Sequence, residues 1–401
     1  MENVTKTVID CIKYEICGQK EKIVLPEISA RFLIEVYKLS KAHDVAHLVG
    51  DALNKSGVFE NFPDDIDENE RAAISKVKEK FDEQIFTAVY RYENINYELE
   101  RLKETLEEAE IPFIPLKGSV IRKYYPEPWM RTSCDIDILV REEDLKRAKK
   151  AICEKLGYAF EGRHYHDISM FSQSGVHLEL HFHLKETISG IDAVLMQAWE
   201  FAALKAGKKY EHEFSNEFLA FQLAAHNSYH FQHGGCGIRP FIDFQVLENS
   251  GEFTYDEEKL NELLRGGGIY KFYLETKALA EVWFCGAEHT ELTKKIEMYV
   301  LDGGVYGSMK NSLAMRQSKK RGKFGYAMSR IFLPYDTLKN YHPTLQKHKW
   351  LLPFFEVKRW FEILFSPRLK SGINELSESN KITQEDREKM KNLLDELELQ
   401  D

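Results

Sequence analysis

Residues 111–140 of this 401-residue chain, IPFIPLKGSVIRKYYPEPWMRTSCDIDILV, contain the pattern that decides the fold. The stretch opens with a short apolar run that ends in glycine, which is typical of a buried strand leading into a turn. It closes with DIDILV, which alternates polar and apolar side chains and then stays apolar, as a second strand does. The segment between them suits a short helix that two prolines end. The stretch therefore predicts a strand–helix–strand unit.

The residues that follow extend this unit. Residues 141–158, REEDLKRAKKAICEKLGY, form an amphipathic helical pattern closed by Gly157. Two further strand candidates come next, DISMFSQ at 167–173 and VHLELHFHL at 176–184, with a Ser-Gly turn between them. The resulting order is strand, helix, strand, helix, strand, strand. This order predicts a small mixed sheet with helices on one side.

Helical patterns surround this core on both sides. Apolar residues recur every three or four positions from Ile74 to Leu106, which predicts one very long helix with a packing seam along it. Helical segments with short breaks return from about residue 192 to residue 365. The sequence therefore predicts an α+β chain in which a small mixed-sheet core lies between helical regions. The regions we expect are an N-terminal helical region (1–110), an α/β core (111–185), a C-terminal helical region (186–375) and a polar tail with one exposed helix (376–401).

Composition restricts the class of protein. Hydrophobic residues make up 43% of the chain and charged residues 30%, which is ordinary for a soluble globular protein. The net charge of −10 argues against nucleic-acid binding over the whole surface, although a local basic patch remains compatible with it. The six cysteines form no CxxC pair, which favours reduced thiols in a cytosol. No leader segment or apolar run of about 18 residues is apparent, so we expect a cytoplasmic protein that does not bind a membrane.

Asp135 and Asp137 are the first candidates for chemistry. Side chains two residues apart on a strand point to the same face, so both carboxylates can reach one cation or bridge two. Two adjacent carboxylates without a cation repel each other. Mg²⁺ is commonly held by one or two carboxylates together with substrate phosphates. The pattern therefore predicts a divalent-metal site at the start of this strand.

Lys117, Gly118 and Ser119 are candidates for binding phosphate. A strand that ends in glycine before a helix presents backbone N–H groups suited to an anion. The Ser119 hydroxyl adds a donor, and the Lys117 amine adds positive charge. An ordinary strand-to-helix turn is the alternative interpretation.

A third acidic residue follows on a later strand. In HLELHFH, residues 177–183, alternate side chains share one strand face, so Glu179 and His181 lie together. Two aspartates and one glutamate on adjacent strands can hold two metal ions, which clamp the attacking and leaving oxygens of an in-line phosphoryl displacement. His181 is a candidate to orient Glu179 or to contact the nucleotide.

The segments LKGSVIRKYYPEPWMRTSCDIDILV and VHLELHFHL together resemble the uncharacterised bacterial nucleotidyltransferases of the polymerase-β-like superfamily. That superfamily combines a glycine-serine turn, an Asp-x-Asp strand and a third acidic residue on a later strand. The resemblance is specific over residues 111–183 and looser in the flanking helices. The matching positions are Gly118, Ser119, Asp135, Asp137 and Glu179.

The resemblance implies a metal-dependent reaction. Mg²⁺ or Mn²⁺ on the three carboxylates would bind a nucleoside triphosphate, and an acceptor hydroxyl would attack its α-phosphorus with release of pyrophosphate. Glu179 would be either a metal ligand or the base that takes the acceptor proton. The acceptor can be a small molecule, a protein or an RNA end. A toxin or stress component that modifies tRNA or protein would be one case of this reaction. A catalytically weak regulatory protein that binds the nucleoside triphosphate is the alternative.

Charged residues around this core allow further hypotheses. Arg131, four residues before the first aspartate, is placed to contact a phosphate with two N–H groups, or to lie on the surface. Arg239 and Asp243 have the i, i+4 spacing of a helical salt bridge, and a wall of the substrate cleft is the alternative.

The middle of the chain is rich in histidine, and a basic segment follows it. His226 and His230 have an i, i+4 spacing that can bind zinc, but the HExxH pattern is absent, so polar packing or a substrate contact is favoured. The basic segment 316–323 can grip a triphosphate or an RNA backbone, or it can be a solvated loop. Its basic residues are Arg316, Lys319, Lys320, Arg321 and Lys323.

Overall fold

The computed structural model describes residues 2–18, 21–60, 66–305, 307–319, 322–333, 335, 338, 342, 344–364 and 368–399. Lys320 and Arg321 of the basic segment therefore lie outside the described residues. Over the described ranges, no helix combines the length and the apolar character that crossing a bilayer requires.

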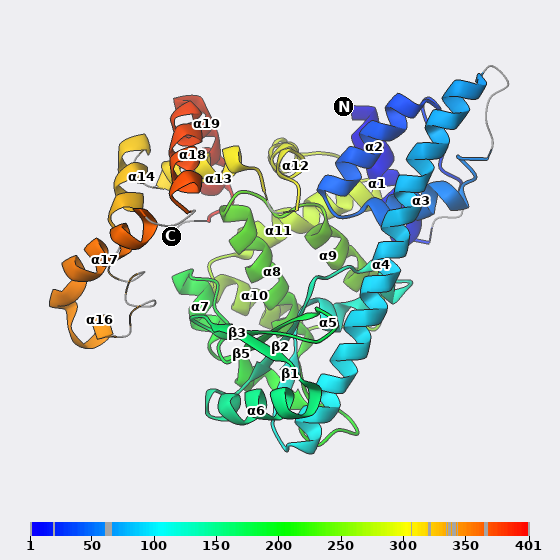
Figure 1. Ribbon diagram of the computed structural model, residues 1–401. Helices are drawn as coiled ribbons and strands as arrows, with labels where there is room; N and C mark the ends of the chain where they lie inside the picture. The colour runs from blue at the N-terminus through cyan, green and yellow to red at the C-terminus, as the bar shows by residue number, and fades with distance from the viewer. Residues whose placement is uncertain are drawn as a thin grey trace.

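A very long helix connects the N-terminal helices to the sheet (Figure 1). Its 41 residues confirm the prediction of one long helix, and its N-cap, Asp67, accepts a hydrogen bond from the backbone N–H of Glu70. The first part of its apolar seam joins the core of the N-terminal helices, and its last turns join the core beneath the sheet. The helices of this region are α1 (Glu2–Ile16), α2 (Ala30–Ala42), α3 (Ala46–Lys55) and α4 (Glu68–Glu108).

The main sheet of the described residues has the strand order β1-β2-β5-β4-β3. The pair β2–β5 is parallel and the other pairs are antiparallel, so the sheet is mixed, as predicted. Strand β3 was not predicted, because AFEGR lies at the edge of the sheet with mostly exposed side chains and has no regular alternation. The elements are β1 (Phe113–Pro115), α5 (Gly118–Ile121), β2 (Asp135–Val140), α6 (Leu145–Leu156), β3 (Ala159–Arg163), β4 (Asp167–Phe171) and β5 (His177–His181), with 3₁₀ turns at Arg122–Tyr124, Pro128–Met130 and Glu142–Asp144.

The two faces of the sheet have different chemistry. Ile136 and Ile138 of β2, with Leu178 and Leu180 of β5, pack into one apolar core with α4 and α6. The predicted arrangement of helices on one side of the sheet is confirmed for this face. Because side chains alternate along a strand, the aspartates of β2 and the glutamate of β5 point to the opposite face. That face carries the candidate site.

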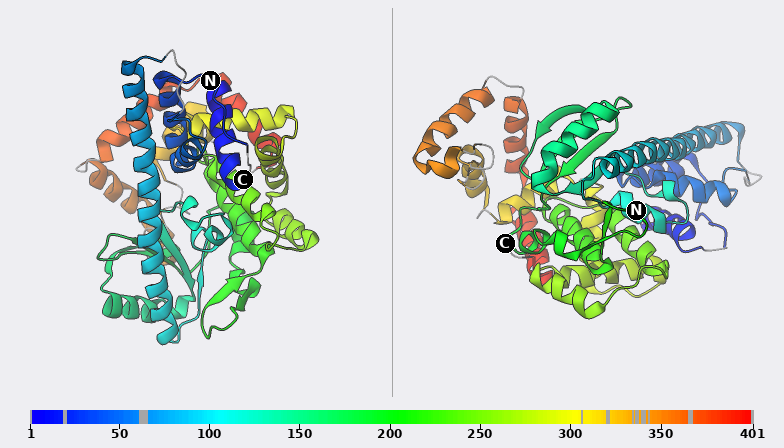
Figure 2. Two further views of the ribbon diagram at one scale, coloured as in Figure 1. Left: turned by 90° about the vertical axis from the view of Figure 1, so that its right-hand side faces the viewer. Right: turned by 90° about the horizontal axis from the view of Figure 1, so that it is seen from below.

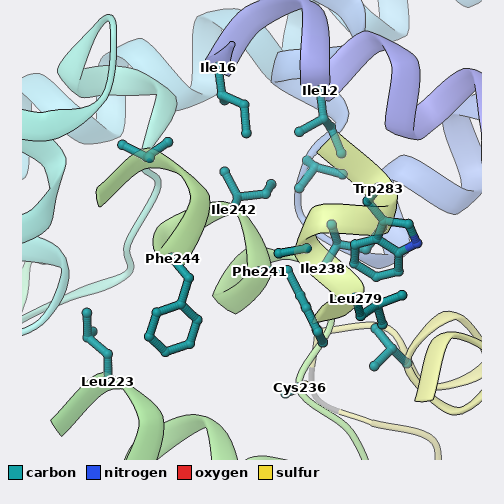
Figure 3. Packing of buried hydrophobic residues seen from close by; sticks show 14 of the residues in the cluster. Ile12, Ile16, Leu223, Cys236, Ile238, Phe241, Ile242, Phe244, Leu279 and Trp283 are labelled. Atoms are coloured by element: carbon teal, nitrogen blue, oxygen red, sulfur yellow. The ribbon is translucent and has the colours of Figure 1, made fainter. Parts of the chain in front are cut away.

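The helices that follow the sheet pack around α9 (Arg239–Asn249) (Figure 3). Ile238, Phe241 and Ile242 contact apolar side chains of α1, α8 (Asn216–Gln232) and the region of α11 (Tyr270–Ala280) in one shared core. The elements here are α7 (Ser189–Leu195), a 3₁₀ turn (Ala198–Phe201), the hairpin β6 (Ala202–Leu204) and β7 (His212–Phe214), α8 (Asn216–Gln232), α9 (Arg239–Asn249), α10 (Glu257–Gly266), α11 (Tyr270–Ala280), a π-helical turn (Glu281–Cys285) and α12 (Glu291–Gly303). The hairpin was not predicted.

The last helix is not the exposed tail helix that the sequence suggested. Leu393 and Leu394 are buried in the main core, and the Glu396 carboxylate pairs with the Lys295 amine of α12 at 2.6 Å. A narrow leucine edge on a polar helix is therefore enough to dock it. The remaining elements are α13 (Met309–Lys319), α14 (Gly322–Ile331), α16 (Thr344–Lys347), a 3₁₀ turn (Lys349–Leu351), α17 (Leu352–Leu364), α18 (Arg368–Lys381) and α19 (Gln384–Glu396). Of these, α14, α16 and α17 lie on the opposite side of the molecule from α1–α3, as Figure 1 and the right-hand view of Figure 2 show.

Candidate functional site

The polar face of the sheet brings the predicted acidic residues together. The parallel register of β2 and β5 places Asp137 opposite Glu179 and Asp135 opposite His177. Glu179 belongs to two ligand sets and so links the two aspartates. The sets in the described part of the chain whose ligand atoms lie within 4.8 Å of one another are Asp135–His177–Glu179, Asp137–Glu179–His181 and His166–Asp167–His181.

Asp137 is the buried anchor of this site, with only 5% of its surface exposed. The Lys117 amine lies 3.3 Å from its Oδ1 atom, and His181 Nε2 lies 2.8 Å from the same oxygen. Burial alone would raise the pKa of Asp137, but the charge of Lys117 and the hydrogen bond from His181 hold it well below its usual range. Asp137 is therefore ionised and held between two cationic groups.

The other two carboxylates differ from Asp137. Burial and the charge of Asp137 raise the pKa of Asp135. A hydrogen bond from His181 lowers the pKa of Glu179, whose side chain is 31% exposed. For His181 itself, burial opposes the charged form, but the hydrogen bonds to Asp137 and Glu179 raise its pKa to about 9. The carboxylates thus repel one another, and a divalent cation would relieve that repulsion. Carboxylate oxygens are the donors that Mg²⁺ and Mn²⁺ prefer, so these residues fit such an ion.

The turn between β1 and α5 places Lys117 over the acidic pair. Lys117 has φ of 46°, a conformation that costs energy for a residue with a side chain. Burial opposes its charge, but Asp137 and Glu186 raise the pKa of its amine above the usual range. The Ser119 N–H donates to the Leu116 carbonyl at 3.1 Å, so the turn itself uses this group. The strained backbone conformation is therefore at Lys117, and its amine lies beside the Asp137 carboxylate.

A comparison with known families identifies the chain at this level. A family model described as "Uncharacterised nucleotidyltransferase" matches residues 34–285. This is well over half of the 401 residues. The chain belongs to this family.

The matched region of this family member contains the whole sheet together with α8 and α9. The resemblance predicted from the glycine-serine turn and the aspartates is thereby confirmed. No curated protein matches the chain, and no solved structure matches it either. The family assignment therefore establishes a nucleotidyltransferase relationship without naming an acceptor.

Each of the three guanidinium nitrogens of Arg131 donates a hydrogen bond within the protein. Its Nε and Nη2 atoms donate to the two carboxylate oxygens of Asp243 at 2.6 and 2.9 Å, and its Nη1 donates to the Thr132 carbonyl. The Tyr125 hydroxyl donates to the same Asp243 carboxylate at 2.5 Å. These contacts brace the loop before β2 against α9.

The predicted salt bridge within α9 is wrong. Asp243 pairs with Arg131, and Arg239 pairs instead with Asp44 in the turn between α2 and α3, at 2.7 Å. The two side chains of α9 extend to different neighbouring elements, so the i, i+4 spacing does not bring them together. Both residues connect α9 to segments far away in the sequence.

Glu186 is a residue of the site region that the sequence analysis missed. Its Oε1 atom lies 2.9 Å from Nδ1 of His226, and Nε2 of His226 lies 3.1 Å from Nε2 of His230. The i, i+4 spacing of the two histidines was the available signal, and it led to a zinc hypothesis. Among the described residues, the convergent ligand sets do not include this pair. Its partner is a carboxylate instead.

The described residues of the basic segment contact other protein groups. Arg316 pairs with Glu375 of α18 at 3.3 Å, and the Lys319 amine donates to the Gln232 side chain at the end of α8. Lys323 donates to the backbone carbonyl of Asn380. In this structure these side chains therefore help to dock α13 and α14 on their neighbours.

Proposed function

We propose that this protein is a divalent-metal-dependent nucleotidyltransferase that moves a nucleoside monophosphate from a nucleoside triphosphate to an acceptor hydroxyl and releases pyrophosphate. One observation carries the proposal. The carboxylates of Asp135, Asp137 and Glu179 gather on one face of the sheet directly beneath the Lys117 turn. A carboxylate cluster beside a cationic turn suits a metal-bound triphosphate.

The three carboxylates would hold Mg²⁺ or Mn²⁺ in this proposal. Asp137 is the anchoring ligand, because it is buried and ionised, and Glu179 links it to Asp135. When bound, the metal neutralises the phosphate charge and polarises the phosphorus–oxygen bond. His181 positions Asp137 and Glu179 through its Nε2 contacts at 2.8 and 3.4 Å.

The turn of Lys117, Gly118 and Ser119 would face the phosphates. We assign the Lys117 amine the main role, because it is the positive charge nearest the carboxylates. The Ser119 hydroxyl is a second donor in the proposal. Arg131 is assigned to bracing the loop, since Asp243 occupies its guanidinium. The six free cysteines agree with the cytoplasm as the proposed compartment.

Transfer of label tests this function. Each of the four ribonucleoside triphosphates, labelled on the α-phosphate, is incubated with the protein, Mg²⁺ or Mn²⁺ and a cell extract, and the RNA, protein and small-molecule fractions are counted. Label that appears only with intact Asp135 and Asp137 supports the proposal and identifies the acceptor class. Metal-dependent triphosphate binding without transfer would favour the alternative, a regulatory protein with this fold. If the protein neither transfers the label nor binds a triphosphate, the assignment of the site to a nucleotide is contradicted.

Replacing Lys117 with glutamine is expected to separate nucleotide binding from metal binding. Loss of a charged hydrogen bond to phosphate costs about 1.5–3 kcal/mol, so affinity for the metal–triphosphate should fall about 10- to 100-fold. Without nucleotide, Lys117 competes with a cation for Asp137, so Mn²⁺ alone should bind more tightly to the variant. Isothermal titration calorimetry measures both constants.

Lys123→Gln is the matched control for this experiment. Lys123 lies in the same turn region, but its side chain is exposed and its amine lies over the Tyr124 ring, 4.7 Å from the ring centroid. Both affinities should be unchanged in this variant. Equal triphosphate affinity for Lys117→Gln and Lys123→Gln would show that Lys117 does not bind the phosphates.

A further inference from the structure

A hydrogen-bonded chain of titratable side chains lies beside the acidic face. Glu186 follows β5, and His226 and His230 lie one turn apart on α8. The Glu186 carboxylate contacts His226 Nδ1 at 2.9 Å, and the two imidazoles meet through their Nε2 atoms at 3.1 Å. The roles proposed above use none of these residues.

The chain shares the electrostatic environment of the acidic site. The charge of Glu186 is among the causes that raise the pKa of Lys117, and the charge of His226 is among those that lower the pKa of Asp137. Lys117 and Asp137 are themselves in contact. The Glu186–His226–His230 chain therefore borders the centre where the triphosphate would bind.

The proton positions in this chain follow from the acidity of its ends. Burial would raise the pKa of Glu186, but the charge of His226 and its hydrogen bond lower it, so Glu186 is an ionised acceptor and His226 Nδ1 is the donor. Burial and the charge of His226 lower the pKa of His230 to about 3, so His230 is neutral. The tautomer of His226 that donates from Nδ1 to Glu186 has a lone pair on Nε2, and that lone pair accepts from the Nε2–H of His230.

One nitrogen of the chain remains available. His230 Nδ1 then carries a lone pair, and among the described residues it accepts no hydrogen bond. It is also not one of the polar atoms that the protein encloses. A hydroxyl group that approaches α8 at His230 can therefore meet this nitrogen.

We propose that Glu186, His226 and His230 form a proton relay that deprotonates the acceptor hydroxyl, which makes His230 a catalytic residue and the other two positioning residues. The proposal rests on the nucleotidyltransferase function proposed above. It assigns the base to this relay and leaves Glu179 to the metal. It also places the acceptor on the α8 side of the site.

The proposed step balances as follows. The acceptor O–H bond breaks, and its proton goes to His230 Nδ1 while the oxygen forms a bond to the α-phosphorus. The proton on His230 Nε2 passes to His226 Nε2, so the positive charge comes to rest beside the Glu186 carboxylate. The bond between the α-phosphorus and the bridging oxygen breaks, and pyrophosphate leaves with that electron pair.

The relay accounts for the presence of two histidines instead of one. With its low pKa, His230 alone would be a weak base, and a proton that stayed on it would lie in a site that also holds the Lys117 charge. Transfer to His226 moves the charge next to a carboxylate, which favours it. The charged and titratable groups that act on the pair from neighbouring elements are Lys117, Asp137, Glu186 and His233. Tyr229 stacks edge-on against His230.

The test compares His226→Ala and Glu186→Gln with the wild-type protein. The probe is an equimolar mixture of the four α-labelled ribonucleoside triphosphates with Mn²⁺ and a heat-treated cell extract, and the initial rate of label incorporation is measured from acid to alkaline pH. General-base catalysis contributes about 10²- to 10⁴-fold, so His226→Ala should lose that factor. The pH dependence of the rate should also differ from that of the wild type, because the side chain that takes up the relayed proton is gone.

Two controls keep the outcomes distinct. His233→Gln removes a neighbouring histidine of the same helix region whose Nδ1 contacts the Tyr229 carbonyl, and it should leave the rate and its pH profile unchanged. Calorimetric affinity of each variant for Mn²⁺ and the triphosphate shows that its nucleotide site is folded. If the wild-type protein incorporates no label, the proposed nucleotidyltransferase function itself is contradicted. An active wild type with an unchanged rate and pH profile in His226→Ala, or a loss fully explained by weaker triphosphate binding, would overturn the relay.

Discussion

Replacing Asp137 with asparagine is expected to reduce nucleotidyl transfer by about 10³-fold or more, because a metal that stabilises developing charge contributes several kcal/mol to the transition state. Asparagine keeps the size of the side chain but removes the negative charge that faces Lys117 and His181. Those two cationic groups would then lie beside a neutral amide, which opposes binding of a further cation. Single-turnover incorporation of α-labelled nucleotide measures the loss.

Metal binding gives an independent measure of the same variant. Mn²⁺ bound to the native state should raise the melting temperature of the wild-type protein, and this increase should be absent in Asp137→Asn. Glu143→Gln is the matched control, because Glu143 is an exposed acid in the turn after β2. It should behave as the wild type in both assays. Transfer by Asp137→Asn at a rate close to that of Glu143→Gln would contradict the assignment of Asp137 to the metal.

Local patterns predicted much of the core. The alternation in DIDILV and HLELH gave both the strands and the shared face of Asp135, Asp137 and Glu179, because side-chain direction on a strand depends only on position. The stripe along α4 gave a helix of the expected length for the same kind of reason. Strand β3 was not predicted because an edge strand buries few side chains. Its sequence therefore lacks the apolar pattern that identifies the other strands.

Contacts between segments far apart in the chain could not be predicted from local sequence patterns. Glu186 and His226 are 40 residues apart, and Arg131 and Asp243 are 112 residues apart, so no local window contains either pair. The i, i+4 spacing of Arg239 and Asp243 was misleading, since helix spacing shows which side chains are near neighbours but not which way packing draws them. The strained turn at Lys117 also leaves no local signal, because only the surrounding fold holds it there.

Replacing Asp243 with asparagine is expected to lower the free energy of unfolding by about 3–5 kcal/mol, because the buried Arg131 guanidinium would lose its counter-charge. The Arg131 and Asp243 side chains are only 11% and 7% exposed, so water cannot take over the lost contacts. The amide oxygen can accept at most two of the three hydrogen bonds that the carboxylate accepts from Arg131 and Tyr125, because the amide nitrogen is a donor and cannot replace the second oxygen. A decrease in the melting temperature of about 4–6 °C should follow for a chain of this length, measured by calorimetry.

Asp44→Asn tests whether burial is the cause. Asp44 also pairs with an arginine of this network, Arg239, at 2.7 Å, but its side chain is 35% exposed. Solvent screening should limit its loss to about 1 kcal/mol or less. The double variant Arg131→Met/Asp243→Leu should recover part of the stability that Asp243→Asn loses, because it removes both buried charges together. Equal losses for Asp44→Asn and Asp243→Asn would show that the buried charge of Arg131 is not what ties the loop before β2 to α9.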